Sequence, residues 1–143
     1  MDAIAQLLAR LAEAIDRRQP EQIANKFTAD AQFRGGSPDL LVGPDAIRAM
    51  YEQRFSANSQ RRTRHLWSNL RTELRGEQEV AYRVTLSVYA FEPQRSATTI
   101  QMRVIEAEGI CVRGEDGQWL LKTQFSEPFF EVQMPLASPL PAA

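Results

Sequence analysis

Residues 79–91 read EVAYRVTLSVYAF, and they decide the fold because apolar side chains occupy every second position. The apolar positions are Val80, Tyr82, Val84, Leu86 and Val88, and the residues between them include Arg83, Thr85 and Ser87. A period of two places successive side chains on opposite faces of a sheet, whereas a helix repeats about every 3.6 residues. The pattern predicts a β-strand longer than the usual length of roughly five to six residues.

The preceding segment, RRTRHLWSNLRTEL at residues 61–74, has the same period. Leu66, Leu70 and Leu74 alternate there with His65, Trp67 and Asn69. A turn at residues 75–78 separates the two segments, so we expect them to pair as neighbouring antiparallel strands.

A third strand is expected from Ile100, but its alternation slips at residues 104–105, where two apolar side chains are adjacent. Such a slip predicts a β-bulge or a bend, either there or at Gly109. A last strand follows the turn at residues 115–117, and we expect Pro128 to limit it.

Helical periodicity precedes the strands. A first helix is predicted by an apolar stripe at helix spacing, formed by Ile4, Leu7, Leu8, Leu11, Ala12 and Ile15. Pro20 suits the first turn of a short second helix, and residues 28–33 are expected to form a short strand that residues 35–38 break. A third helix is expected from Pro44 to the neighbourhood of Asn58.

Helices that precede a meander of long antiparallel strands predict an α+β fold in a single domain. Long strands that contain a bulge must curve, so we expect a cone-shaped antiparallel or mixed sheet wrapped around the N-terminal helices. We assign residues 1–133 to this domain and expect residues 134–143, which include three prolines, to be a loosely ordered tail. A hollow inside such a cone is a place where small-molecule sites form.

Composition excludes several classes of function. The 143 residues are 43% hydrophobic and 24% charged, with a net charge of −1, so no strong field favours nucleic acid or an anionic membrane as a partner. No apolar segment approaches the roughly 20 residues that cross a bilayer, and the N-terminus lacks the pattern of a secretory signal. A single cysteine, Cys111, excludes an intrachain disulfide and a multi-cysteine metal site. We expect a cytoplasmic protein without a metal or another cofactor.

Several short motifs, in their order and spacing, resemble the nuclear transport factor-like superfamily. They are AIDRR at 14–18, FTADA at 27–31, GPDAI at 43–47, RTRHLWSN at 62–69 and DGQW at 116–119. That superfamily includes SnoaL-like polyketide cyclases, scytalone dehydratase, ketosteroid isomerase and the small subunits of ring-hydroxylating dioxygenases. The resemblance implies the cone fold and a homodimer that forms through the convex face of the sheet.

The resemblance also singles out Asp16 and His65. Dehydratase-like members pair an aspartate at the end of the first helix with a histidine on the first long strand, and these residues occupy those two positions. The second histidine of scytalone dehydratase has no counterpart, and Ile15 stands at the position of its helix tyrosine. A carboxylate on one ring nitrogen sets the tautomer and leaves the other nitrogen free to move a proton. We predict hydrogen-bonding contact between the two side chains, at roughly 2.6 to 3.2 Å.

Two interpretations of His65 remain open at this point. It is either an acid/base residue inside a cavity or a histidine that is simply hydrogen-bonded at the sheet surface or in a dimer contact. Alternation places His65 on the face opposite Leu66, so it points away from the cavity if the leucine face is concave. A bulge would reverse this arrangement.

Other side chains are candidates for contact with a substrate, namely Tyr51, Trp67, Asn69, Tyr82, Met102 and Phe125. The Asn69 amide suits a carbonyl or an enolate, and tyrosine hydroxyls suit polar substituents. The remaining members suit an apolar or aromatic ligand. Each also fits a plain core position or a solvated strand position.

Two functions therefore compete. The first is a cofactor-free acid/base enzyme, a dehydratase, isomerase or cyclase, acting on an apolar substrate that bears a carbonyl or a hydroxyl group. The second is a non-catalytic structural subunit or ligand-binding module, because RTRHLWSN also resembles the dioxygenase small subunit. The chain has too few histidines and cysteines to supply iron ligands itself, so this second function requires an oxygenase large subunit as partner.

Overall fold

The computed structural model describes residues 2–138 and shows the predicted order of helices followed by long strands. The helices are α1 (Asp2–Asp16), α2 (Pro20–Ala24) and α3 (Pro44–Ala57). The strands are β1 (Phe27–Arg34), β2 (Leu41–Val42), β3 (Arg62–Leu74), β4 (Glu79–Phe91), β5 (Thr99–Arg113) and β6 (Trp119–Pro135). The two-residue strand β2 was not predicted, because so short a segment has no period to detect.

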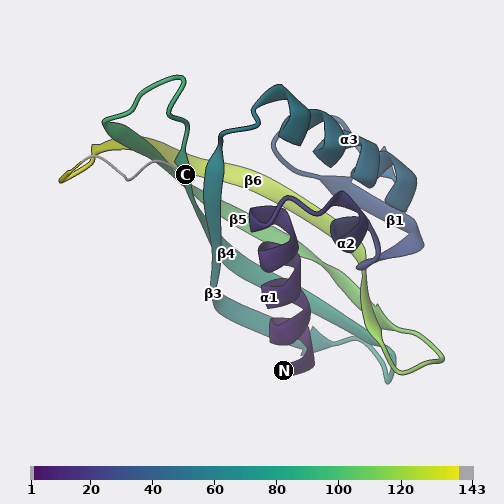
Figure 1. Cartoon of the computed structure of the whole chain (residues 1–143). Coiled ribbons are helices and arrows are strands. Elements are labelled where there is room, and N and C mark those ends of the chain that lie inside the picture. The colour runs from purple at the N-terminus through teal and green to yellow at the C-terminus, as the bar shows by residue number, and fades with distance from the viewer. Residues whose placement is uncertain (1, 139–143) are drawn as a thin grey trace.

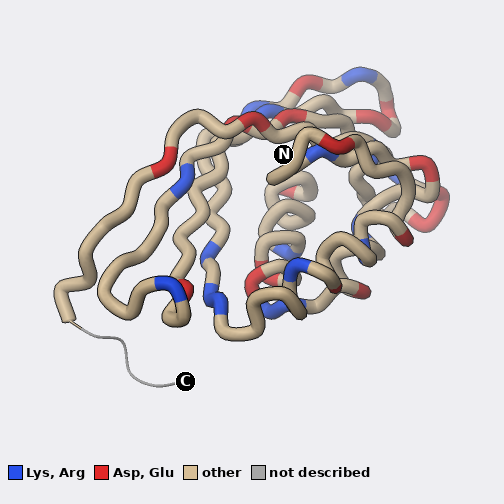
Figure 2. Tube along the Cα trace, turned by 90° about the horizontal axis from the view of Figure 1, so that it is seen from above, with Lys and Arg blue, Asp and Glu red and all other residues tan. Residues whose placement is uncertain are grey.

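The strands form one mixed sheet in the order β2-β1-β6-β5-β4-β3. β1 lies parallel to β6, and the other neighbouring pairs are antiparallel. The sheet curves strongly around the helices without closing into a barrel, with α1 beside β3 and α3 beside β1 (Figure 1). Seen from above, the sheet and the helices surround a common interior (Figure 2). This is the predicted α+β cone.

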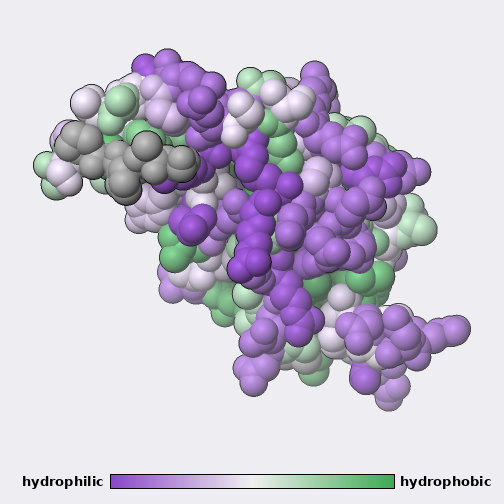
Figure 3. Space-filling model, viewed as in Figure 1, coloured by the Kyte–Doolittle hydropathy of each residue, from purple (hydrophilic) through white to green (hydrophobic). Residues whose placement is uncertain are grey.

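The apolar stripe of α1 is the centre of the core. Ile4, Leu8 and Leu11 are 0%, 1% and 1% exposed. Burial of each such side chain contributes about 1.5–3 kcal/mol, which is enough to hold α1 against the sheet. The polar side of the helices faces outward, and the surface on this side of the molecule is largely hydrophilic (Figure 3).

The concave face of β3 carries Thr63, His65 and Trp67, which are half-buried, whereas Leu66 is 52% exposed. The face of β3 that carries His65 is therefore the concave one, and Leu66 points to the convex side. The register of β3 against β4 shifts between Ser68 and Arg71, so one extra residue lies on β3 there. Asn69 stands in this bulge with a φ of 54°, a left-handed conformation that asparagine tolerates better than most residues.

A register shift lies where the sequence predicts an irregularity of the third long strand, but the extra residue is on β6, since β5 pairs continuously with β4. The register between β5 and β6 shifts between Val104 and Ile105, and again between Ile110 and Cys111. Gly109 lies close by, and a Cβ there would stand 1.9 Å from the carbonyl oxygen of Thr123, so only glycine fits this close approach.

The prediction that Pro128 limits the last strand is wrong, since β6 continues to Pro135. Pro128 pairs with Ile105 while Phe130 pairs with Val104, so the proline stands beside an extra residue. A proline has no N–H for the ladder, and a bulge is one of the few strand positions where this loss is tolerated.

The predicted tail begins within β6, because Met134 still pairs with Ile100. Residues 139–143 of that tail lie outside the described part of the chain. Among residues 2–138 no helix is long and apolar enough to cross a membrane.

Candidate active site

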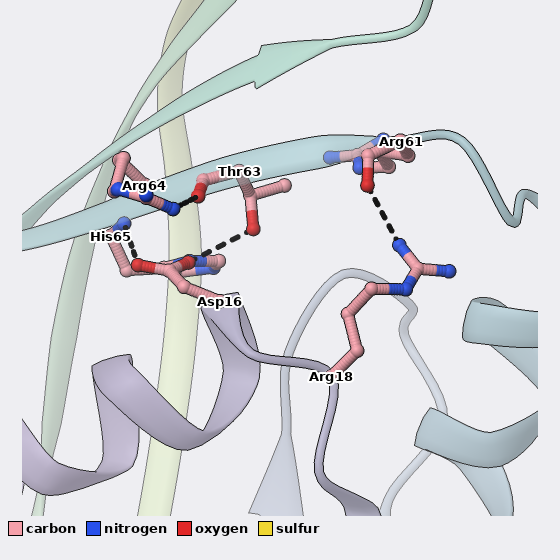
Figure 4. Close-up of polar contacts among 6 residues, drawn as sticks. All are labelled: Asp16, Arg18, Arg61, Thr63, Arg64 and His65. Carbon is pink, nitrogen blue, oxygen red and sulfur yellow. Dashed lines mark hydrogen bonds and ion pairs between the residues drawn. The ribbon is translucent and has the colours of Figure 1, made fainter. Parts of the chain in front are cut away.

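Asp16 is the last residue of α1, and the backbone after it turns sharply. Arg18 donates its N–H to the carbonyl of Ile15 at 3.0 Å, and Gln19 donates to that of Ala14 at 3.0 Å. This pair of bonds is the Schellman arrangement that ends many helices with a residue in the left-handed region. Arg18 occupies that position with a φ of 58°, where glycine is usual. The turn sends the chain away and leaves the Asp16 carboxylate facing β3 (Figure 4).

The Asp16 carboxylate accepts three hydrogen bonds from β3. His65 Nδ1 lies 2.6 Å from Oδ1, and the backbone N–H of His65 donates to Oδ2 at 3.0 Å. The hydroxyl of Thr63 donates to Oδ1 at 2.9 Å. β3 is an edge strand, so the outward N–H of His65 has no strand partner, and the carboxylate supplies one.

The carboxylate remains ionised at neutral pH. Burial acts to raise the pKa of Asp16, but the hydrogen bonds and charge from His65, with the bond from Thr63, outweigh burial and lower that pKa below its ordinary value. An ionised carboxylate only accepts, so Nδ1 of His65 carries the proton in their shared bond. Nε2 is then the nitrogen that is free to take a proton from another molecule.

His65 lines a cavity of about 370 Å³ inside the cone. Apolar and aromatic side chains form much of its wall, namely Ile15, Phe33, Tyr51, Phe55, Trp67, Leu86, Val88 and Ile105. Gln124 and Ser126 of β6 are polar members of the wall, and arginines also line it. The side chains of Asp16 and His65 are only 10% and 13% exposed, so their pair is largely withdrawn from water.

A second hollow lies between α1 and β3, and Asp16, His65 and Trp67 line it too. Its remaining wall includes outward positions of α1, among them Ala9 and Glu13, and Arg17 just after the helix. Because those positions belong to the solvent face of the helix, we take the interior cavity as the candidate site.

Of the predicted contact residues, Tyr51 and Trp67 line the cavity with His65. Burial raises the pKa of Tyr51 to about 12, although the charge of Arg54 opposes it, so this phenol stays protonated. The indole Nε1 of Trp67 is buried and has no hydrogen-bond partner in the described part of the chain. Tyr51 thus brings an O–H group, and Trp67 an N–H group, to the wall of the cavity.

The other four predicted residues lie outside the cavity. Asn69 is exposed in the bulge of β3, and Tyr82 is a core residue with 2% exposure. Met102 and Phe125 occupy strand positions adjacent to inward-facing Arg103 and Gln124, so they point to the convex face. Alternation in the sequence does not show which phase of each strand is concave, so it could not tell on which face these two side chains lie.

Sequence reasoning missed Gln124, Arg54 and Arg103, which all line the cavity. Gln124 is 4% exposed, and its Oε1 is buried without a partner in the described residues. A polar residue at an inward strand position would have been a signal, but only once the inward phase of β6 was known.

Arg18 holds the connection between α3 and β3 against the end of α1. Its guanidinium donates to the carbonyl oxygens of Phe55, of Asn58 at 2.7 Å and of Arg61 at 2.9 Å. The same group lies 4.8 Å from the centre of the Phe55 ring. Arg18 thereby joins the helix that ends in Asp16 to the segment that leads into His65.

Two other kinds of site, a metal site and a reactive cysteine, have little support within residues 2–138. No group of three or more histidine, cysteine, aspartate or glutamate side chains in that range is arranged to hold a metal ion. Cys111 is buried, and burial raises the pKa of its thiol to about 12, so it is a core residue and a poor nucleophile.

The chain belongs to the SnoaL-like domain family, whose model matches residues 1–123. Its fold is the nuclear transport factor-like cone that the motifs predicted. No curated protein matches the sequence closely enough to count as a relative.

Solved structures share the fold at low sequence identity. A candidate scytalone dehydratase from Novosphingobium aromaticivorans is 18% identical, with a TM-score of 0.83 over 99% of this chain and 91% of that one. LinA is 18% identical, with a TM-score of 0.81 over 99% of this chain and 92% of that one. ActVI-ORFA from Streptomyces coelicolor is 19% identical, with a TM-score of 0.75 over 89% and 95%.

Proposed function

We propose that the protein is a cofactor-free acid/base enzyme, a lyase or isomerase. In this enzyme His65 moves a proton, and Asp16 orients the ring of His65. The observation that carries this proposal is the 2.6 Å contact between Nδ1 of His65 and Oδ1 of Asp16 in a side-chain pair that borders an interior cavity. A histidine that served only the sheet surface would need neither a buried carboxylate nor a cavity.

The chemistry requires a substrate carbon whose hydrogen is acidified by a neighbouring carbonyl. Nε2 of His65 takes that proton, and the electron pair of the broken C–H bond moves into an enolate. Asp16 stabilises the resulting imidazolium. In a dehydration, the enolate expels a hydroxyl group that receives the proton from Nε2 and leaves as water. In an isomerisation, Nε2 returns the proton to another carbon.

The cavity wall suits an apolar or aromatic substrate with a few polar substituents. Tyr51 offers a neutral hydroxyl, and Trp67 offers an unpartnered indole N–H, so either can donate to a carbonyl or an enolate oxygen. A buried donor without a partner costs about 1–3 kcal/mol, which a bound acceptor would offset. The similar structures carry names of dehydratase and dehydrochlorinase types, which is consistent with this chemistry.

The direct test measures proton abstraction rather than a product. The probe is 1-tetralone, an aromatic ketone, and NMR in heavy water follows exchange of the hydrogens beside its carbonyl. We expect the wild type to catalyse exchange and His65→Gln to lower the rate by about 10²–10⁴-fold, the usual contribution of a general base. Asp16→Asn should also lower it, because an amide can favour the wrong tautomer.

A matched control is Arg64→Gln, which changes the exposed neighbour of His65 and should leave exchange unaltered. Equal exchange by the wild type and by His65→Gln, in folded proteins, would place the chemistry elsewhere. If a panel of ketones and β-hydroxy ketones shows no catalysed exchange at all, the non-catalytic subunit becomes the better explanation.

The convex face exposes an apolar patch, here called the convex-face patch, formed by Leu66, Tyr89, Phe130 and Val132. We propose that a second copy of the chain covers it. An oxygenase large subunit is the competing occupant under the non-catalytic function.

A further inference from the structure

The side chains that line the cavity carry more positive than negative charge. It contains the guanidinium groups of Arg18, Arg54, Arg61 and Arg103, whereas no aspartate or glutamate of the described residues lines it. The net charge of the whole chain is −1, so this excess of positive charge is local to the cavity.

Two of these arginines are already committed to the fold. Arg18 binds three backbone carbonyls, and Arg61 forms an ion pair with Glu92 in which the side chains are 29% and 14% exposed. Burial lowers the pKa of Arg18, and the nearby charge of Arg61 lowers it further, so positive groups crowd this end of the cavity. A carboxylate would relieve that crowding.

The other two arginines have capacity to bind a ligand. Arg54 donates to the carbonyl oxygen of Gly35 at 2.8 Å and lies 5.5 Å from the centre of the Tyr51 ring, so both of these contacts are uncharged. Arg103 lies 3.5 Å from a carboxylate oxygen of Glu131, in a pair with 32% and 47% exposure. So exposed a pair is weak, and Arg103 can share its guanidinium group with a second carboxylate.

Arg103 is also aligned with the candidate base. His65 pairs with Val88 across β3 and β4, and Val88 pairs with Arg103 across β4 and β5. The three residues therefore share one row on the concave face. Two strand spacings separate the backbones of His65 and Arg103, roughly 9.5 Å. A long guanidinium side chain at that distance can hold one end of a bicyclic molecule while His65 meets the other.

We propose that the cavity takes an aromatic carboxylate, with Arg103 as the main contact of the carboxylate group and Arg54 as a second. This proposal rests on the proposed function, because it names the class of substrate that His65 would act upon. A guanidinium group meets a carboxylate with two parallel hydrogen bonds, and this geometry selects against a neutral amide of the same shape.

The experiment compares two ligands of nearly the same shape, 2-naphthoate and 2-naphthamide, by isothermal titration calorimetry at low and high salt. We expect the wild type to bind 2-naphthoate about tenfold more tightly than 2-naphthamide, or better, because a charge-assisted hydrogen bond is roughly twice as strong as a neutral one. High salt should weaken the binding of 2-naphthoate and leave that of 2-naphthamide unchanged.

Arg103→Gln and Arg54→Gln should each weaken the binding of 2-naphthoate, with the larger loss of affinity for Arg103→Gln. The affinity for 2-naphthamide should stay the same in both variants. The matched control is Arg83→Gln, since Arg83 forms a similar ion pair, with Glu108 at 3.2 Å, and its side chain is 71% exposed. Thermal unfolding of each variant checks that the fold is retained. Equal affinity for the two ligands, equal losses for Arg83→Gln and Arg103→Gln, or no binding of either ligand at millimolar concentration would overturn the proposal.

The same titration in His65→Gln separates this inference from the proposed function. Retained preference for 2-naphthoate in that variant supports the carboxylate site independently of catalysis. If ketone exchange depends on His65 but 2-naphthoate has no advantage over 2-naphthamide, the acid/base function stands and the carboxylate inference fails.

Discussion

Asp16 occupies an electrostatically unfavourable position that its partners make tolerable. The carboxyl end of a helix carries a partial negative charge, so a carboxylate at the last residue of α1 is repelled. Three hydrogen bonds from β3 compensate for that repulsion and for burial. A residue that needs this much support for its charge is typical of a functional site rather than of a site chosen for stability.

The lowered pKa of Asp16 predicts how stability depends on pH. Because the pKa in the folded protein lies below the unfolded value of about 3.9, the carboxylate stabilises the fold fully above that pH. The contribution is lost as the pH falls through the lowered pKa. We expect Asp16→Asn to reduce the free energy of unfolding by about 2 kcal/mol at neutral pH, from the loss of charge-assisted bonds.

Urea unfolding at about pH 6 and about pH 3 measures this effect, and the difference between wild type and Asp16→Asn should shrink at the lower pH. Asp39→Asn, which changes an exposed loop carboxylate, is the control and should alter stability by less than about 0.5 kcal/mol. An unchanged difference at both pH values would show that the Asp16 carboxylate is not the stabilising group.

At the scale of the elements, the connection between α1 and β3 depends on one side chain. Arg18 adopts a left-handed backbone conformation, which costs a non-glycine residue roughly 1–2 kcal/mol. Its guanidinium group joins the end of α1 to the last turn of α3 and to the segment just before β3. The backbone strain of Arg18 therefore lowers the stability of the fold, whereas the hydrogen bonds of its side chain raise it.

Two substitutions separate these contributions. Arg18→Ala removes the three hydrogen bonds and keeps the strain, and we expect a loss of about 2–3 kcal/mol in urea unfolding. Arg18→Gly removes the bonds and also the strain, so it should be about 1 kcal/mol more stable than Arg18→Ala. The adjacent control Arg17→Ala removes only an exposed pair with Glu13 at 3.1 Å and should cost less than about 0.5 kcal/mol. If Arg18→Ala behaves like Arg17→Ala, Arg18 does not hold the connection.

At the scale of the whole molecule, the sheet has two faces with different roles. Its concave face covers the core and the cavity, whereas its convex face leaves Leu66 and Phe130 52% and 50% exposed. These two residues belong to one row across the sheet, since Leu66 pairs with Ser87, Ser87 with Val104 and Val104 with Phe130. Half-buried Ser87 and Val104 lie between them, so the exposed apolar side chains are spread over one face of the sheet. Apolar surface gathered on one face in this way indicates a surface that another molecule covers.

We expect a homodimer that buries the convex-face patch. Analytical ultracentrifugation should give about twice the chain mass of 16.2 kDa for the wild type. Leu66→Glu should lower the measured mass to that of the monomer, because a charge cannot be buried in the interface without a partner. Leu74→Glu is the control, since Leu74 is 70% exposed at the far end of the same strand and should leave the dimer intact. A wild type that is monomeric at all concentrations, or a Leu74→Glu variant that dissociates equally, would contradict this interface.

The sequence by itself determined the order and type of the elements, because periodicity, prolines and glycines act over a few residues and are legible locally. It also determined the family, and with it the pairing of Asp16 with His65, since the motifs that carry the resemblance are continuous. The tertiary structure alone decided which face of each strand is concave. A single extra residue near Asn69 changes the side-chain phase of β3, and no local pattern shows which phase a helix will cover. For the same reason, Arg54, Arg103 and Gln124 became neighbours of one cavity only when distant elements packed together.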